Sequence, residues 1–513
     1  MAIELSNLTF TDEDDYITSP PFALEQILNT GIANTLAGND IIIGGGDPYG
    51  FKNVGILNTA EGNDIIKGTS SEGMGISLSD ISSLDTEKGD DVIIGTGLYG
   101  IKNDSITFTT GDGNDTITGI GRVRNTPNVY SGYGIVNSGT LNAGEGNDII
   151  TGTSESYDSG HRAGSICYGI VNSGTLNAGE GNDTLTGTGE DYGINYGIIN
   201  SGTLNMGDGN DEITGIGPFY AINNSGTLTT EEGNDIISGR SENKGLNNTG
   251  TLNTGEGDDI ITTTNTTTFY QSCMYNSGSI DTSDGNDTIA SSGRSIGISN
   301  AGIINSGNGE DFIISRGDLI NSGEVFLGDG NDSISVNRYY APYYAVVENF
   351  DFIGTGDGND TITSTGRVDN QGVIETGNGD DSIIVDIDTE GLNITYGIKN
   401  NGGTINMGDG NDSIIANQGF ESGYNSSGAW FLGEGDDYIK GYGSGNFYGG
   451  NGNDTLELTP GTYTVGIGGE GGESPIFTKG NQLMITSEFE KLKAGNTLYD
   501  FTSLIAGQII TVA

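Results

Sequence analysis

The stretch Asn172-Ser173-Gly174-Thr175-Leu176-Asn177-Ala178-Gly179-Glu180-Gly181-Asn182-Asp183-Thr184-Leu185 recurs in variant form along nearly the whole chain. Alignment on its final aspartate gives 17 copies. The aligned residues are Asp40, Asp64, Asp91, Asp115, Asp148, Asp183, Asp211, Asp235, Asp259, Asp287, Asp311, Asp332, Asp360, Asp381, Asp412, Asp437 and Asp454.

Each copy keeps a fixed internal length. Two residues before the aspartate there is always Gly, two residues after it always Ile or Leu, and seven residues before it always an apolar residue. Eleven residues before it there is Asn in 13 of the 17 copies, for example Asn53, Asn137 and Asn401. The distance between successive aspartates varies from 17 to 35 residues and is most often 24. Insertions are therefore confined to one segment of each repeat.

A rigid repeat with insertions at one place is typical of a solenoid. We therefore predict an all-β fold, an elongated parallel β-helix or β-solenoid with about 17 coils and terminal caps. The two apolar positions lie in separate strands on either side of a glycine-rich turn and point inward. Glycine supplies the positive φ values that such turns need.

The repeats divide the chain into three segments. Residues 1–28 precede the first repeat and are expected to form an N-terminal cap that covers an open sheet edge. Residues 29–457 form the solenoid. Residues 458–513 lack the acidic turn and are expected to form a C-terminal cap.

The spacers contain a further strand signal, as in Tyr133-Gly134-Ile135-Val136-Asn137 and Tyr168-Gly169-Ile170-Val171-Asn172. A third strand per coil favours a three-sided β-helix over a flat two-sheet roll. The recurring Asn is expected to stack on its neighbours in a structural amide ladder. The long spacer within 152–165 is expected to bulge from one edge.

The composition excludes several classes of protein. Lys and Arg number 18 against 70 Asp and Glu, so the formal net charge is −52 and nucleic-acid binding is very unfavourable. No segment is long and apolar enough to span a membrane. Only Cys167 and Cys273 occur, so no disulfide framework is expected.

The acidic turns predict a cation. Stacked coils place equivalent carboxylates roughly 4.8 Å apart, and each neighbouring pair then costs roughly 1 kcal/mol even in water. Lys88 is the one basic residue in these turns. Ca²⁺, which accepts six to eight oxygen ligands, meets the need. The alternative is that Asp and Asn cap their turns by local hydrogen bonds and stay hydrated.

The segment Gly449-Gly450-Asn451-Gly452-Asn453-Asp454-Thr455-Leu456-Glu457 resembles the nonapeptide G-G-x-G-x-D-x-U-x of the RTX family of calcium-binding repeats, and Gly207 to Thr214 fits all but its first glycine. The resemblance implies a β-roll or β-helix that folds on binding extracellular calcium through the Asp side chain and turn carbonyls. It differs in having one such turn per coil, which suggests one column of ions. Asp40 and Asp91 are the weakest candidates because their turns depart most from the motif. The expected metal ligands are Asp64, Asp115, Asp148, Asp183, Asp211, Asp235, Asp259, Asp287, Asp311, Asp332, Asp360, Asp381, Asp412, Asp437 and Asp454.

The N-terminus shows no secretory signal, whereas residues 458–513 resemble the uncleaved tails of cyanobacterial-type RTX proteins exported by type I secretion. The resemblance implies an extracellular or cell-surface location.

The sequence predicts a non-enzymatic, calcium-binding structural or adhesive protein, such as a surface layer, matrix fibre or self-associating rod. Its partners would be calcium, itself in a homo-oligomer or filament, or a cell-surface glycan gripped by the aromatic insertion at 339–344.

Two alternatives remain open. Five copies carry outward Thr-x-Asn pairs that would suit an ice-binding or crystal-surface-binding face: Thr140 and Asn142, Thr175 and Asn177, Thr203 and Asn205, Thr251 and Asn253, Thr404 and Asn406. A polysaccharide-acting β-helix enzyme would need a base and cationic groups. The lone His161 lies beside Arg162 in a long spacer, and no cluster of Arg, Lys and Tyr stands out.

Overall fold

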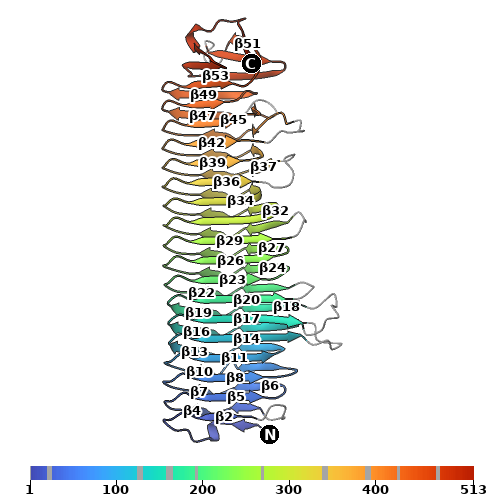
Figure 1. Ribbon diagram of the computed structural model, residues 1–513, viewed down its shortest axis with the longest axis vertical. Helices are drawn as coiled ribbons and strands as arrows, with labels where there is room; N and C mark the ends of the chain where they lie inside the picture. Colours follow the sequence, from blue (N-terminus) through green and yellow to red (C-terminus); the bar gives the residue numbers. More distant parts are fainter. Residues whose placement is uncertain are drawn as a thin grey trace. The chain divides into compact units, whose positions relative to one another are not determined.

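The structure, a computed structural model, describes residues 2–19, 26–123, 131–156, 166–190, 195–266, 271–337, 345–387, 394–423, 428–468 and 474–513. In these residues the chain forms a parallel β-solenoid of about 16 turns, which confirms the predicted fold class (Figure 1). The chain divides into two compact units, each described by itself: residues 1–267 with 278–280, and residues 268–277 with 281–513.

Each coil contributes three strands, as predicted from the spacers. Around Asp64, β7 (Ile56–Asn58) precedes the acidic turn, β8 (Ile65–Thr69) follows it, and β9 (Met74–Leu78) is the third strand. They pair in parallel with β4 (Ile32–Asn34), β5 (Ile41–Gly45) and β6 (Tyr49–Asn53) of the preceding coil. Equivalent strands therefore stack into a first, a second and a third column.

In the first unit the columns extend over successive coils. The first column continues with β10 (Ser83–Asp85), β13 (Thr107–Asp112), β16 (Thr140–Glu145), β19 (Thr175–Glu180), β22 (Thr203–Asn205), β25 (Thr227–Thr229) and β28 (Thr251–Asn253). The second contains β2 (Tyr16–Thr18), β11 (Val92–Gly97), β14 (Thr116–Val123), β17 (Ile149–Ser156), β20 (Thr184–Glu190), β23 (Glu212–Ile216), β26 (Ile236–Ser241) and β29 (Ile260–Asn265). The third contains β1 (Ile3–Glu4), β3 (Ile27–Asn29), β12 (Tyr99–Asn103), β15 (Ser131–Asn137), β18 (Ile166–Asn172), β21 (Tyr196–Asn200), β24 (Tyr220–Asn224) and β27 (Lys244–Asn248).

The second unit repeats this plan. Its first column contains β33 (Ile303–Asn305), β35 (Glu324–Phe326), β38 (Phe352–Gly354), β41 (Val373–Glu375), β44 (Thr404–Asn406), β47 (Ala429–Glu434) and β49 (Gly445–Asn451). Its second contains β36 (Ser333–Asn337), β39 (Thr361–Ser364), β42 (Ser382–Val385), β45 (Ser413–Ala416), β48 (Tyr438–Lys440) and β50 (Thr455–Leu458). Its third contains β30 (Ser272–Asn276), β37 (Ala345–Asn349), β40 (Arg367–Asn370), β43 (Ile398–Asn400) and β46 (Phe420–Glu421). In β32 (Thr288–Asn300) and β34 (Phe312–Asn321) the second and third strands run together.

The core is one layer of apolar side chains per coil. Leu57 of β7, Ile66 of β8 and Ile76 of β9 are at most 1% exposed, and the register places Leu57 beside Ala33 and Ile66 beside Ile42. Burial of each such side chain contributes about 1.5–3 kcal/mol. The two apolar positions predicted to point inward are therefore confirmed.

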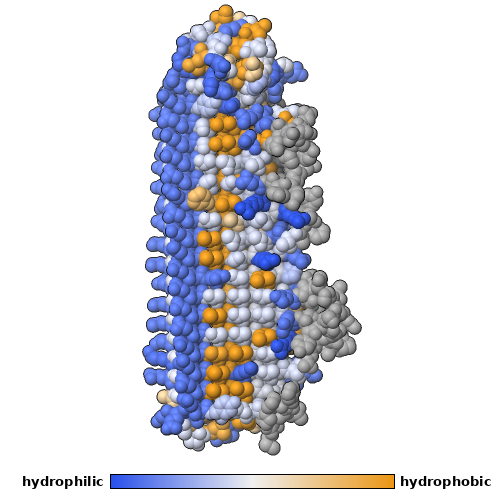
Figure 2. Space-filling view, viewed as in Figure 1, coloured by the Kyte–Doolittle hydropathy of each residue, from blue (hydrophilic) through white to orange (hydrophobic). Residues whose placement is uncertain are grey.

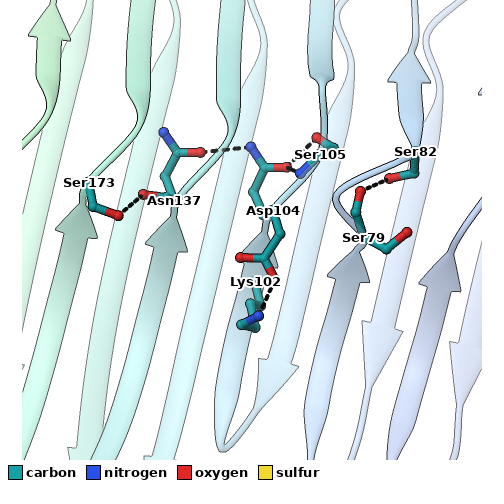
Figure 3. Close-up of polar contacts among 8 residues, drawn as sticks. Ser79, Ser82, Lys102, Asp104, Ser105, Asn137 and Ser173 are labelled. Carbon is teal, nitrogen blue, oxygen red and sulfur yellow. Dashed lines mark hydrogen bonds and ion pairs between the residues drawn. The ribbon is translucent and has the colours of Figure 1, made fainter.

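The predicted amide ladder is confirmed at the corner after the third column. The Asn103 side chain donates from Nδ2 to Asn137 Oδ1 over 2.7 Å, and Asn137 donates to Asn172 over 2.8 Å. Figure 3 shows the Asn137 carboxamide in this row, close to the pair formed by Lys102 and Asp104. Asn401, eleven residues before Asp412, was predicted as a member, but the neighbouring Asn400 accepts the bond from Asn370. The spacer in that coil is one residue out of step, which moves Asn400 into the row.

The C-terminal residues change from parallel to antiparallel pairing. β51 (Gly461–Ile467) pairs antiparallel with β52 (Pro475–Lys479) and β56 (Ile509–Val512), and β52 with β53 (Gln482–Ser487). β54 (Lys491–Ala494) continues the second column in parallel with β50 and pairs antiparallel with β55 (Thr497–Asp500). Short 3-10 helices span Leu5–Asn7 (η1) and Phe501–Ser503 (η3).

Several predictions concern residues outside the described ranges. These are the bulge within 152–165 beyond Ser156, His161 and Arg162, and the aromatic insertion at 339–344. Cys167 and Cys273 are both buried and form no disulfide with each other. Among the described residues, no helix has the length and hydropathy to cross a bilayer.

Candidate metal centre

The acidic turn connects the first column to the second, and its backbone requires glycine. In the turn before Asp211, Gly207 has φ +96° and Gly209 has φ +144°. A Cβ built on Gly209 would lie 1.8 Å from the carbonyl oxygen of Gly181 in the preceding coil. This close contact between coils explains why the residue two before the aspartate is Gly in every copy.

The turn aspartates point inward in both units. Asp211 is 2% exposed and Asp235 is fully buried, and every other member of the set is equally shielded. We call this set, Asp40 to Asp259 in the first unit and Asp287 to Asp454 in the second, the inner carboxyl column. The alternative of hydrated carboxylates does not hold for side chains buried in this way.

One oxygen of each inner carboxyl has a partner. The Asp183 N–H donates to Asp211 Oδ1 over 2.7 Å, and the Asp211 N–H donates to Asp235 Oδ1 over 2.7 Å. The same bond links successive members along each unit, and at the C-terminal end the Asp454 N–H donates to Glu490 Oε2 over 2.8 Å. Each carboxyl therefore accepts a hydrogen bond from the turn of the preceding coil and holds the two turns together.

The other oxygen has no partner. Oδ2 of every inner carboxyl, from Asp40 to Asp454, is buried without a hydrogen bond among the described residues. Buried polar groups without partners cost roughly 1–3 kcal/mol each, and more when charged. A column of free carboxylate oxygens is therefore stable only if a proton or a cation accompanies them.

Burial sets the pKa values of these groups. Desolvation, together with the neighbouring carboxylates of the column, raises the pKa of Asp211 to about 8 and that of Asp148 to about 7. Where the residue five before the aspartate is Thr, its hydroxyl opposes the rise, as Thr230 does at Asp235, whose pKa is about 6. In the coil of Asp211 the corresponding residue is the buried Met206.

A second ladder runs along the outside of the same turns. The Asn210 N–H donates to Asn182 Oδ1 over 2.6 Å, and the Asn182 N–H donates to Asn147 Oδ1 over 2.8 Å. These exposed side chains bind the coil after them, whereas the inner carboxyls bind the coil before them. The hydrophilic edge in Figure 2 contains the exposed acids and amides of these turns.

The donor set fits a hard cation. Each turn offers a free Asp Oδ2, and the carbonyl of its second glycine, such as Gly209, accepts no hydrogen bond among the described residues. Carboxylate and carbonyl oxygens are the ligands that Ca²⁺ prefers. No group of three or more His, Cys, Asp or Glu side chains converges in the described part of the chain, so carbonyls would have to complete each site.

Asp40 and Asp91 share the inward position, the Oδ1 bond and the free Oδ2 of the others. At the fourth residue before the aspartate, Leu36 and Glu87 adopt φ +66° and +61° in place of glycine, as Ala60, Glu231 and Ser283 do in the turns of Asp64, Asp235 and Asp287. The sequence predicted them to be the weakest candidates because of Leu36 with Ala37 and Glu87 with Lys88, yet their carboxyls lie in the same column. Glu490, which ends the column, has no surrounding repeat motif that could have identified it.

No family model matches the chain. No curated protein matches it either. Among solved structures, the chain is similar to a hyperactive, Ca²⁺-dependent, β-helical antifreeze protein from an Antarctic bacterium, at 17% identity over 79% of this chain and 83% of that chain, with a TM-score of 0.29. At that identity and TM-score the similarity carries no functional information.

The structure also gathers a charged cluster that the sequence did not indicate. Arg367 of β40 donates to Tyr396 Oη over 2.8 Å, and Lys399 of β43 pairs with Glu421 over 3.0 Å. Asp369 lies between the two cations, and burial raises its pKa. Three cavities lie elsewhere, along the first column and at the C-terminal strands. The cluster is an ion network on the outer face of the third column.

Proposed function

We propose that the protein is a calcium-loaded structural or adhesive repeat protein of the cell exterior. The observation that carries the proposal is the inner carboxyl column, whose buried Oδ2 atoms need a positive partner in every coil. The column aspartates and turn carbonyls would hold Ca²⁺, which would neutralise the carboxylates and join successive turns. Folding coupled to calcium suits an exterior where the ion is abundant, and export by type I secretion fits the C-terminal resemblance.

Calcium binding should depend on the inner carboxyls and not on the exposed acids. We expect Asp211→Asn to remove one bound ion per chain, because Asn keeps the Oδ1 acceptor and loses the free anionic oxygen. In calcium the variant should melt at lower temperature than the wild type. In chelator at neutral pH it should melt at higher temperature, because burial raises the pKa of Asp211 to about 8, so the wild type must take up a proton there on folding, whereas Asn needs none.

Asp208→Asn is the matched control, since Asp208 lies in the same turn and is exposed. Equilibrium dialysis should show that this variant binds as many calcium ions as the wild type. Thermal circular dichroism should give it the wild-type melting temperature, both in calcium and in chelator. Equal ion counts for wild type and Asp211→Asn would refute the assignment of the inner carboxyls as ligands.

Ice or crystal-surface binding is a second candidate because threonines share one register in the first unit. The outward rank consists of Thr140, Thr175, Thr203, Thr227 and Thr251. A regular rank of hydroxyl and methyl groups suits an ordered surface.

If this rank binds ice, the calcium-loaded protein should show thermal hysteresis, and Thr203→Tyr should abolish most of it by interrupting the rank. Thr186→Tyr, on the second column of the same unit, should leave it unchanged. Nanolitre osmometry measures both, and a wild type without hysteresis would dismiss this candidate.

A further inference from the structure

Phe326 and Phe352 lie on the outer face of the first column in the second unit, where Phe431 and Tyr448 form another aromatic pair further along. Where other coils carry Thr and Asn, β35 presents Phe326, which is 37% exposed, and β38 presents Phe352. The register pairs Phe326 with Gly354, and Glu324 with Phe352. The two rings therefore lie diagonally across neighbouring strands, with centroids 5.1 Å apart and planes inclined by 37°.

Gly354 makes room for one of these rings. Eight repeats carry Asn at its position, for example Asn205 and Asn406. A Cβ built on Gly354 would lie 2.6 Å from the Phe352 ring, so the ring lies over the bare Cα of that glycine. The φ of Gly354 is not in the left-handed region, so the backbone does not demand glycine here. Glycine at this position therefore leaves the space that the Phe352 ring occupies.

The rings form one wall of a cavity of about 280 Å³. Gly328, Gly356 and Gly377 form its floor, and the carboxylates of Asp357 and Glu375 line its rim. Asn378 donates to Asp357 Oδ1 over 2.7 Å, which holds that carboxylate in place and leaves its other oxygen able to accept. The cavity thus combines an aromatic wall with acceptors that carry negative charge.

We propose that this cavity is a binding subsite for an uncharged, β-linked hexose chain. The apolar C–H face of a pyranose ring packs on exposed aromatic rings, and its hydroxyls donate to the rim carboxylates. The pocket size suits a single sugar ring, and the glycine floor lets a chain approach the backbone closely. The inference rests on the proposed function, because it names the partner class of the adhesive protein.

The charges around the cavity discriminate between ligand classes. An acidic polysaccharide would meet only carboxylates, so the rim excludes it. A basic peptide would be attracted by charge along the whole acidic edge, with no preference for this cavity, and added salt would weaken it. Stacking of an uncharged sugar on Phe326 and Phe352, with its hydroxyls donating to Asp357 and Glu375, should be insensitive to salt because the ligand carries no charge.

Isothermal titration of the full chain in calcium, with cellohexaose as the probe, tests the proposal. We expect saturable binding that added salt does not change. Phe326→Ala with Phe352→Ala should weaken it by about tenfold or more, since tenfold corresponds to the loss of about 1.4 kcal/mol. Gly354→Asn should weaken it similarly, because the added side chain displaces the Phe352 ring.

Phe312→Ala is the control, since Phe312 is 40% exposed on the second column, and it should bind as the wild type does. Circular dichroism should show every variant folded. Absence of cellohexaose binding by the folded wild type, or equal binding by the double variant, would overturn the proposal. Preferential, salt-sensitive binding of hexalysine would assign the cavity to a basic peptide instead. A chain that stays folded and binds cellohexaose in chelator would end the calcium proposal and leave this one standing.

Discussion

In chelator the protein should be unfolded at pH 8 and regain compact β structure as the solution is acidified towards pH 4. The inner carboxyls have pKa values raised by burial, to about 8 for Asp211 and about 7 for Asp259, whereas an unfolded Asp titrates near 3.9. The folded chain therefore holds protons that the unfolded chain releases. Without metal, the contribution of these carboxyls to the free energy of unfolding is fully present below a pH of about 4. It is lost as the pH rises through their folded-state pKa values.

The expected effect is large because the column is long. A rise of about 3 pKa units corresponds to about 4 kcal/mol per group at high pH, and a whole folded domain is stable by only about 5–15 kcal/mol. With calcium bound, carboxylates are the required form, so the dependence should reverse and the fold should be most stable at neutral or alkaline pH. Far-ultraviolet circular dichroism of a dilute solution, titrated with and without calcium, measures both arms. Compact β structure in chelator at pH 8 would contradict the prediction.

Gly209→Ala should destabilise the first unit by about 3 kcal/mol or more. The added Cβ would lie 1.8 Å from the Gly181 carbonyl oxygen, and both atoms belong to stacked backbones that cannot separate without breaking their hydrogen bonds. The positive φ of Gly209 adds strain for any L-residue. Because each coil supports its neighbours, the loss should spread to adjacent coils.

Gly480→Ala separates the cost of the contact between coils from the cost of backbone strain at a positive φ. Gly480 has φ +62°, and no atom lies within 4 Å of the position that its Cβ would take, so only the backbone strain applies. The cost should be about 1 kcal/mol. Thermal denaturation in calcium measures both variants, and hydrogen exchange locates the loss. Similar melting temperatures for the two variants would show that the contact between coils is not what selects glycine.

The sequence predicted the fold well because its signal is repeated. Several features recur at fixed offsets in each repeat: inward positions such as Leu57 and Ile66, the turn glycines and the asparagines of the amide ladder. In a solenoid, residues at equivalent offsets in successive coils stack in rows. The failure at Asn401 arose where the spacer length shifted by one residue, since the row is defined by contact with Asn370 and not by counting from Asp412.

The candidate centre was predicted less completely. The sequence placed an aspartate in every turn, but its direction, its bond to the preceding coil and its free Oδ2 depend on how two coils dock. The Phe326 and Phe352 pair was missed for a related reason, because its members lie in different repeats, 26 residues apart in the sequence, and meet only through the register of β35 and β38.

The opposed directions of the two turn ladders have an evolutionary consequence. Every coil within a unit offers the same pair of surfaces, with Asp Oδ1 facing one neighbour and Asn Oδ1 facing the other. Removal or duplication of one whole repeat rejoins surfaces that already match, whereas loss of a partial repeat does not. Unequal recombination in whole repeats can therefore lengthen or shorten such a gene while each product still folds.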